Sequence, residues 1–264
     1  MRKYYYIFKN SLLEYFAYRL NFILWRIRII VSVLISFFLW QSIYRTNYQV
    51  FGYKESQLLT YIILIIFING ISQSTQTFKI AYEINYGKLA NILIQPINYF
   101  GLNLARDLSD KVLNTLFSLF EIVIIITLLN VPFILQTDFS LIILFIISII
   151  LSAILYFEIN ILLSFIGFWS KEIWAPRFVF YIVVSFLAGI YFPLDILPKV
   201  LYTALRILPF PYLVYFPLKI YLGGLNHDFI FFGFFITIIW IILLSVMLKI
   251  VWRKGLETYT SEGR

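Results

Sequence analysis

The chain has 264 residues, of which 62% are hydrophobic and only 13% are charged, and its mean hydropathy is +0.90. A soluble domain is about 45–50% apolar and about 25% charged, so one globular core of this length could not hide so much apolar surface from water. The chain contains no Cys and only one His, His227, which argues against a metal site, a disulfide or a catalytic triad. These numbers predict an all-α polytopic membrane protein with no metal site and no catalytic residues.

Six stretches of the chain have the length and hydropathy of a membrane crossing. A spanning helix needs about 20 mostly apolar residues. In chain order the candidates are 22–44, 57–78, 109–131, 139–168, 176–194 and 229–252. We therefore expect six transmembrane helices in a single transmembrane domain that covers residues 1–264.

The basic residues predict the orientation of these six helices. With the N-terminus in the cytoplasm, five of the 21 Lys and Arg side chains fall outside: Arg45, Lys54, Lys199, Arg206 and Lys219. The other sixteen fall inside, as the positive-inside rule requires. A composition rich in Ile, Phe, Tyr, Lys and Asn is typical of an AT-rich bacterial genome. The prediction is a multi-pass protein of the bacterial plasma membrane with both termini cytoplasmic. A net charge of +8 spread over several loops suits anionic membrane lipids and argues against nucleic acid.

Residues 1–20 precede the first crossing and have an amphipathic pattern. Tyr5, Phe8 and Leu12 share one face of a helix, while Lys3 and Lys9 fall elsewhere. Aromatic side chains on one side and cations on the other predict a helix in the membrane interface. This helix is either an inert anchor or a contact for a cytoplasmic partner.

A polar interruption, YEINYGKLANILIQPINYF at 82–100, separates the second and third crossings. Leu89, Ile92 and Leu93 recur at helical spacing. Gly87 can loosen the start of this helix, and Pro96 should stop it. We expect a short cytoplasmic amphipathic helix that either floats on lipid headgroups or docks a soluble protein.

The external segment 193–226 is apolar, and it holds five of the eight prolines: Pro193, Pro198, Pro209, Pro211 and Pro217. It cannot be one straight span, because proline interrupts helices. Two short helices, about 198–208 and 212–222, that dip into the outer leaflet would fit. The segment is either a simple interfacial lid or an external gate, for which the candidate residues are Phe192, Pro193, Pro209, Phe210 and Pro211.

Two carboxylates fall within predicted crossings, and intramembrane carboxylates are candidates for function. Glu121 lies about 15 Å below the outer end of its helix and Glu158 about 28 Å below, at 1.5 Å per residue. This difference in depth argues against a proton relay between them. Glu121 is a candidate for a substrate path or for coupling, and the alternative is a structural carboxyl. The chain also lacks a phosphate-binding loop, so any ATPase must be another polypeptide.

Several of these features together resemble a membrane subunit of the type 2 class of bacterial ABC exporters. The resemblance runs through nearly the whole chain and rests on the order of four stretches. They are AYRLNFILW (17–25), GKLANILIQPINYF (87–100), LAGIYFPLDILPKVLYTALRILPFPYLVYFPLKIYLG (187–223) and VWRKGLETYTSEG (251–263).

The resemblance implies six spans per subunit, a second copy or a related permease subunit, and two separate ABC ATPase subunits. ATP and magnesium would bind to the ATPase, so this chain would be non-catalytic and hold no cofactor. The loop between spans two and three would carry a coupling helix that contacts the ATPase through Glu83, Tyr86, Gly87, Lys88, Leu89, Asn91 and Leu93.

Two other functions stay open. A secondary transporter or channel that works without ATP would favour inverted repeats and paired intramembrane charges. A membrane-embedded enzyme would show nucleophiles, His or acidic residues at one depth. The sequence favours neither alternative, because it has no convincing repeat and no such cluster.

Overall fold

The structure, a computed structural model, describes residues 2–45 and 49–260. Met1 of the predicted interfacial helix and residues 261–264 of the basic tail lie outside the described residues. Five helical stretches of the described chain are long and apolar enough to cross a membrane: α2 (Arg19–Tyr44), Glu55–Asn85, α6 (Tyr99–Leu129), Phe139–Phe168 and α11 (His227–Thr258). The prediction of a helical polytopic membrane protein is confirmed. The only strands in the described residues form a small hairpin, β1 (Gln49–Val50) and β2 (Tyr53–Lys54).

Two of the five stretches are composite. Glu55–Asn85 consists of α3 (Glu55–Ile68), the π-helix η1 (Asn69–Gln73) and α4 (Phe78–Asn85). Phe139–Phe168 consists of α7 (Phe139–Phe165) and the short η2 (Ile166–Phe168). The remaining helices are α1 (Arg2–Ala17), α5 (Lys88–Leu93), α8 (Trp174–Leu187), η3 (Leu194–Ile196), α9 (Lys199–Leu205), η4 (Phe210–Leu213) and α10 (Tyr215–Tyr221).

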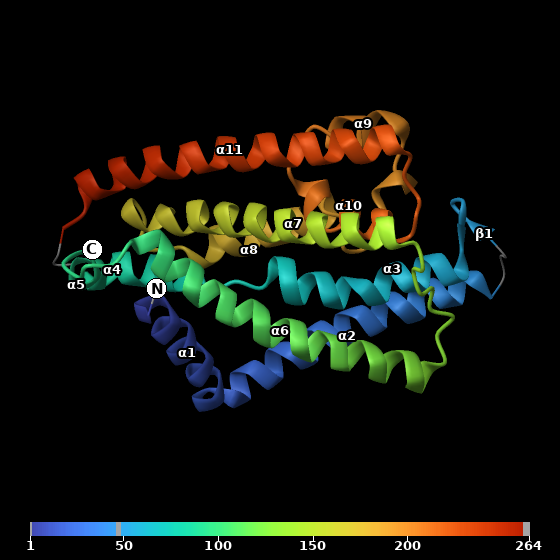
Figure 1. Ribbon diagram of the computed structural model, residues 1–264, viewed down its shortest axis with the longest axis horizontal. Coiled ribbons are helices and arrows are strands. Elements are labelled where there is room, and N and C mark those ends of the chain that lie inside the picture. The colour runs from blue at the N-terminus through green and yellow to red at the C-terminus, as the bar shows by residue number, and fades with distance from the viewer. Residues whose placement is uncertain (1, 46–48, 261–264) are drawn as a thin grey trace.

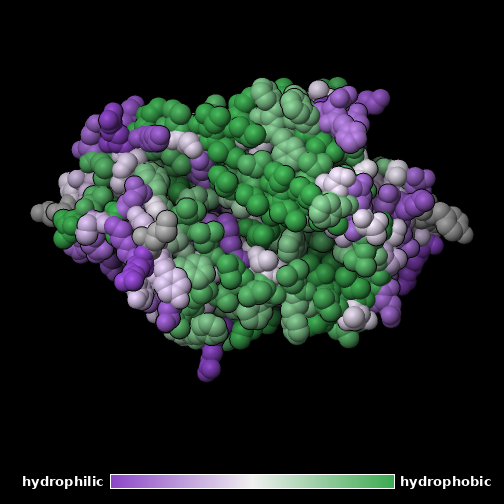
Figure 2. Space-filling model, viewed as in Figure 1, coloured by the Kyte–Doolittle hydropathy of each residue, from purple (hydrophilic) through white to green (hydrophobic). Residues whose placement is uncertain are grey.

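The long helices lie roughly side by side, and the molecule has two distinct ends (Figure 1). The N-terminus, α5 and the last turns of α11 lie at one end, while β1, α9 and the first turns of α11 lie at the other. A broad hydrophobic band covers the middle of the molecule, and hydrophilic residues gather at both ends (Figure 2). This distribution is what a bilayer requires, because lipid tails cannot solvate charged groups.

The fifth predicted crossing is shorter than the sequence suggested. Its helix, α8, has 14 residues and ends at Leu187, seven residues before the predicted end. Fourteen residues extend about 21 Å, which is less than the hydrocarbon core of about 30 Å. The helix stops because Gly189 adopts the left-handed φ of +81°. A side chain at Gly189 would also meet the hydroxyl of Tyr61 at 2.9 Å.

The chain after α8 folds back among the long helices. The hydroxyl of Ser152, halfway along α7, donates to the Leu213 carbonyl at 2.7 Å. The Tyr221 hydroxyl, by contrast, donates to the Ile134 carbonyl at 3.1 Å, just before α7 begins. Since α10 connects these two levels, the segment reaches the middle of α7 and then returns to its start. The predicted helices 198–208 and 212–222 are present as the shorter α9 and α10.

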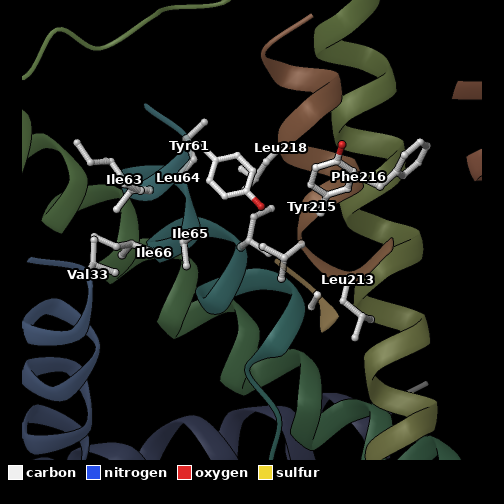
Figure 3. Close-up of a cluster of buried hydrophobic side chains, with 14 of the residues drawn as sticks. Val33, Tyr61, Ile63, Leu64, Ile65, Ile66, Leu213, Tyr215, Phe216 and Leu218 are labelled. Atoms are coloured by element: carbon white, nitrogen blue, oxygen red, sulfur yellow. The ribbon is translucent and has the colours of Figure 1, made fainter. Parts of the chain in front are cut away.

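The main core forms where this returning segment meets α3. Helix α3 is apolar on every side, and nearly all its side chains are buried by neighbouring elements. Figure 3 shows Tyr61 of α3 beside Leu218 of α10, with Tyr215 and Phe216 continuing the same cluster. The Tyr61 hydroxyl donates to the Gly189 carbonyl at 2.6 Å. The core therefore fixes the turn after α8 and the returning helix in one unit.

Candidate functional site

The corner between α4 and α5 is the structure of the polar interruption at 82–100. Gly87 has φ +70° and separates the two helices, a conformation that suits glycine because it has no Cβ. Helix α5 then runs for six residues and ends at Leu93, before Pro96. The predicted short helix, its glycine start and its stop before proline are confirmed.

The inner side of this corner is anchored to α6. A guanidinium nitrogen of Arg106 lies 2.6 Å from the carboxylate of Glu83. The Tyr99 hydroxyl donates to the other oxygen of that carboxylate at 2.9 Å. Leu89 is fully buried in a small cluster that includes Ile80. Glu83 and Leu89 therefore hold the corner from within.

The outer side of the corner presents a different set of residues. Of the seven sequence-predicted contact positions, Tyr86, Lys88, Asn91 and Leu93 are exposed, whereas Glu83, Gly87 and Leu89 are buried. Ile94 is exposed over 83% of its surface, and the sequence analysis missed it. Ile94 could have been found from sequence, because it directly follows Leu93 in the apolar helical repeat that begins at Leu89. We call Tyr86, Lys88, Asn91, Leu93 and Ile94 the corner surface.

Two terminal segments brace this corner. The ammonium of Lys3 in α1 donates to the Pro96 carbonyl, and the Asn98 amide donates to the Tyr4 hydroxyl at 3.2 Å. From the other end of the chain, the Tyr259 hydroxyl accepts a hydrogen bond from the Ala90 amide of α5 at 3.0 Å. Helix α1, predicted to be interfacial, packs along α6 and leaves large apolar side chains such as Phe16 exposed.

Glu121 is paired within the membrane region. The Arg26 Nε of α2 donates to its carboxylate at 2.7 Å, and a second guanidinium nitrogen contacts the other carboxylate oxygen. Arg26 also donates to the Asn114 side chain at 3.2 Å. All three groups are buried, so this is a desolvated ion pair that joins α2 to α6. Arg26 falls inside the first predicted crossing, 22–44, but the sequence analysis did not pair it with Glu121.

Glu158 does not share this arrangement. Its Oε1 accepts a hydrogen bond from Ser245 of α11, while Oε2 is buried and has no hydrogen-bond partner in the described part of the chain. The structure thus assigns the glutamates of the third and fourth predicted crossings to separate environments.

A second network holds segment 193–226, which the sequence analysis predicts to be external, and this network too was missed from sequence. The Lys219 ammonium donates to the Asp195 carboxylate and to the Tyr53 hydroxyl, each at 2.9 Å. Burial and the neighbouring Asp195 charge raise the pKa of Tyr53, so its hydroxyl stays protonated and donates to Asp195 at 2.7 Å. The three residues connect β2, η3 and α10. We call them the external staple.

The five candidate gate residues lie on both sides of Asp195 along the chain. Phe192 and Pro193 directly precede η3, and Pro209, Phe210 and Pro211 lead into or form η4. The ring of Phe210 meets that of Phe180 of α8 edge to face, with 6.1 Å between centroids. Pro193, Pro209 and Pro211 are buried, which places these turns inside the fold.

The long apolar helices, the braced corner between α4 and α5 and the folded-back segment before α11 define a polytopic helical membrane protein. The model of the family described as ABC-2 family transporter protein matches residues 30–263. The chain therefore belongs to the ABC-2 family, whose members are membrane components of ABC transporters. No curated protein matches the chain significantly.

Proposed function

We propose that this chain is the permease subunit of an ATP-driven exporter in the bacterial plasma membrane, with both termini cytoplasmic. It would pair with a second copy or a related permease and with two separate ABC ATPase subunits that bind ATP and magnesium. The observation that carries this proposal is the α4–α5 corner, anchored from inside through Glu83 and Leu89 while the corner surface stays free.

The construction of the corner suits the transmission of force. Helix α4 continues the second crossing, and α6 begins five residues after α5 ends. A displacement of α5 would act on two long helices through the Glu83–Arg106 contact. An ATPase can shift the permease between conformations only if it contacts the corner differently in its nucleotide states.

At the opposite end, the folded-back segment is proposed as a re-entrant external gate. The level of Leu213 beside Ser152, about 20 Å along α7 from its start, supports a dip into the bilayer. Phe192, Pro193, Pro209, Phe210 and Pro211 would form the turns that move, and Glu121 would contribute through the pair that joins α2 to α6.

Cysteine crosslinking tests the partner and the orientation together, because the native chain has no Cys. A cysteine at Ile94 should crosslink to an ATPase encoded beside this gene, and should react with an impermeant maleimide only after permeabilisation. The matched control is a cysteine at Leu135, an exposed leucine in the loop before α7. It should react from outside and form no crosslink. External labelling at position 94 would overturn the topology.

Transport measurements test coupling itself. Tyr86→Asp and Ile94→Asp place charges on exposed positions, so the fold should be retained while ATP-dependent export falls by about tenfold or more. Leu135→Asp is the control for adding a charge to an exposed apolar position. Unchanged export in both corner variants would refute the coupling assignment.

A further inference from the structure

A groove of about 730 Å³ lies between α6, α7 and α11, away from the corner and the external segment. Helix α6 packs on α1, α3 and η1, whereas α7 packs on α11, α10 and η1. The π-helix η1 thus lies between α6 and α7 and contributes Ile71 to the lining. Figure 2 shows a hollow on this face, with hydrophilic atoms at its floor and hydrophobic atoms around it.

The walls of the groove are apolar and its floor is charged. The walls include Leu108, Leu116, Ile150 and Ile154, while the polar lining consists of Asp107, Lys111, Thr115, Glu158, Ser245 and Lys249. Asp107 and Lys111 form an ion pair at 3.2 Å within α6 and compensate each other. Glu158 has no cationic partner in the described residues.

The Glu158 carboxylate is held in place through one oxygen, while its other oxygen has no partner in the described residues. Its side chain is only 8% exposed, and Ser245 fixes Oε1 by a hydrogen bond. Oε2 has no hydrogen-bond partner in the described part of the chain, although it is buried. A buried carboxylate oxygen in an apolar groove is costly unless a donor completes it. The missing partner is therefore a group with an N–H or O–H donor, and a cation fits best.

The rim of the groove carries positive charge, opposite in sign to Glu158. Lys249 lies one helical turn beyond Ser245 on α11 and is exposed. Lys249 also lines an adjoining hollow with Arg253 and Lys254. An anionic group at this rim and an ammonium on Glu158 would lie about one turn of helix apart.

The level of these groups matches the inner surface of a bilayer. Glu158 is 20 positions after Asp138, which caps the outer end of α7, and this corresponds to about 30 Å along the helix. Ser245 is 19 positions after Asn226, the cap of α11, or about 28 Å. The hydrocarbon core is about 30 Å thick, so the charged floor meets the headgroups while the apolar walls meet the tails.

From these contacts we propose that the groove is a selective binding site for an inner-leaflet phospholipid with a primary ammonium headgroup. The ammonium donates to Glu158 Oε2, the phosphate meets Lys249, and an acyl chain lies against Ile150 and Ile154. A quaternary ammonium would be a poor ligand because it has no N–H to donate. This site depends on no ATPase and is separate from the corner surface.

Lipid retention measures this selectivity. The purified chain is reconstituted in nanodiscs with equal parts of phosphatidylethanolamine, phosphatidylcholine and phosphatidylglycerol, then extracted into mild detergent, and the bound lipids are quantified by mass spectrometry. Wild-type protein should retain phosphatidylethanolamine about tenfold over phosphatidylcholine, as expected for a hydrogen bond to a charged group. Equal retention of the three lipids, or preference for phosphatidylglycerol, would overturn the proposal.

Variants separate headgroup recognition from folding. Glu158→Gln should reduce the preference for phosphatidylethanolamine to about twofold or less, whereas Lys199→Gln, at an exposed external lysine, should leave it unchanged. Lys249→Gln should lower the total retention of phospholipid, because all three lipids carry the phosphate that Lys249 meets. Ala153→Leu narrows the groove without changing charge and should lower total retention. Since Lys249 is exposed, its variant tests the site even if Glu158→Gln folds poorly. Wild-type total retention in both Lys249→Gln and Ala153→Leu would refute the site.

Discussion

Glu121 and Glu158 are both buried carboxylates on long helices, but only one of them is completed by the chain. Arg26 approaches Glu121 with two nitrogens, and Asn114 occupies a third donor of the same guanidinium. Glu158 lines a groove and has one hydrogen bond from Ser245, while its second oxygen is buried without a hydrogen-bond partner in the described residues. The difference teaches that the role of a buried charge on a membrane helix depends on its partners. A carboxylate paired with a cation joins two helices, whereas a carboxylate with an unpartnered oxygen can bind a ligand.

The largest effect is expected from opening the closed pair. Arg26→Met would leave the Glu121 carboxylate buried without a cation, and removing one partner of a buried pair costs about 3–5 kcal/mol. We expect this loss in the free energy of unfolding measured in detergent micelles by Trp fluorescence. Arg28→Met is the matched control, because Arg28 lies two residues away, is exposed and lies over the rings of Trp25 and Tyr181 without a carboxylate partner in the described residues.

A double-mutant cycle sharpens this result. The double variant Arg26→Met/Glu121→Gln should lose less free energy of unfolding than the sum of the losses in the two single variants. The reason is that both charges of the pair are removed together, so no buried charge is left unpaired. Additive losses would contradict a direct ion pair. Glu121 would then return to being a candidate for the substrate path alone.

The pair also shows which parts of the molecule can be predicted from sequence. Arg26 and Glu121 are 95 positions apart, and no periodicity connects them. Gly87 and Pro96 act within a few residues, so the corner between α4 and α5 could be predicted with its start and stop. The prolines of the external segment likewise indicated two short helices. The end of α8 at Leu187 was missed, although Gly189 two residues later was an available stop signal. Only the packed fold shows that the Tyr61 hydroxyl approaches this turn closely.

The same limit applies to the site residues. Helical periodicity located α5, but it could not show that Glu83 turns inward to Arg106 or that Leu89 is covered by the helices around it. The groove beside Glu158 requires α11 to pack beside α6 and α7, from which it is distant in the chain, so only the tertiary structure reveals it. Local signals therefore predicted elements, whereas the burial of individual side chains needed the packed fold.

An intermediate effect is expected at the external staple, which resembles the closed pair but is partly open to solvent. Lys219→Met removes two hydrogen bonds and leaves Asp195, whose side chain is 28% exposed. Water can solvate this carboxylate, so we expect a loss of about 1–3 kcal/mol. Hydrogen exchange should be faster in α10, which carries Lys219. Lys199→Met, at an exposed lysine of α9, is the control and should change neither stability nor exchange. Equal effects of both variants would show that Lys219 does not stabilise this segment.

The smallest effect is expected from Glu158→Gln, the same substitution as Glu121→Gln but at the carboxylate that has no cationic partner in the described residues. Glu158→Gln keeps an Oε1 that can accept from Ser245 and separates no ion pair, so the free energy of unfolding should change by less than about 1 kcal/mol. Glu121→Gln, by contrast, leaves a buried Arg26 uncompensated and should cost several-fold more. Both variants carry the same change of charge and shape, so any difference in their unfolding comes from their surroundings. Equal losses would mean that Glu158 is as fully engaged as Glu121, and the distinction between a fastening charge and a ligand-binding charge would fail.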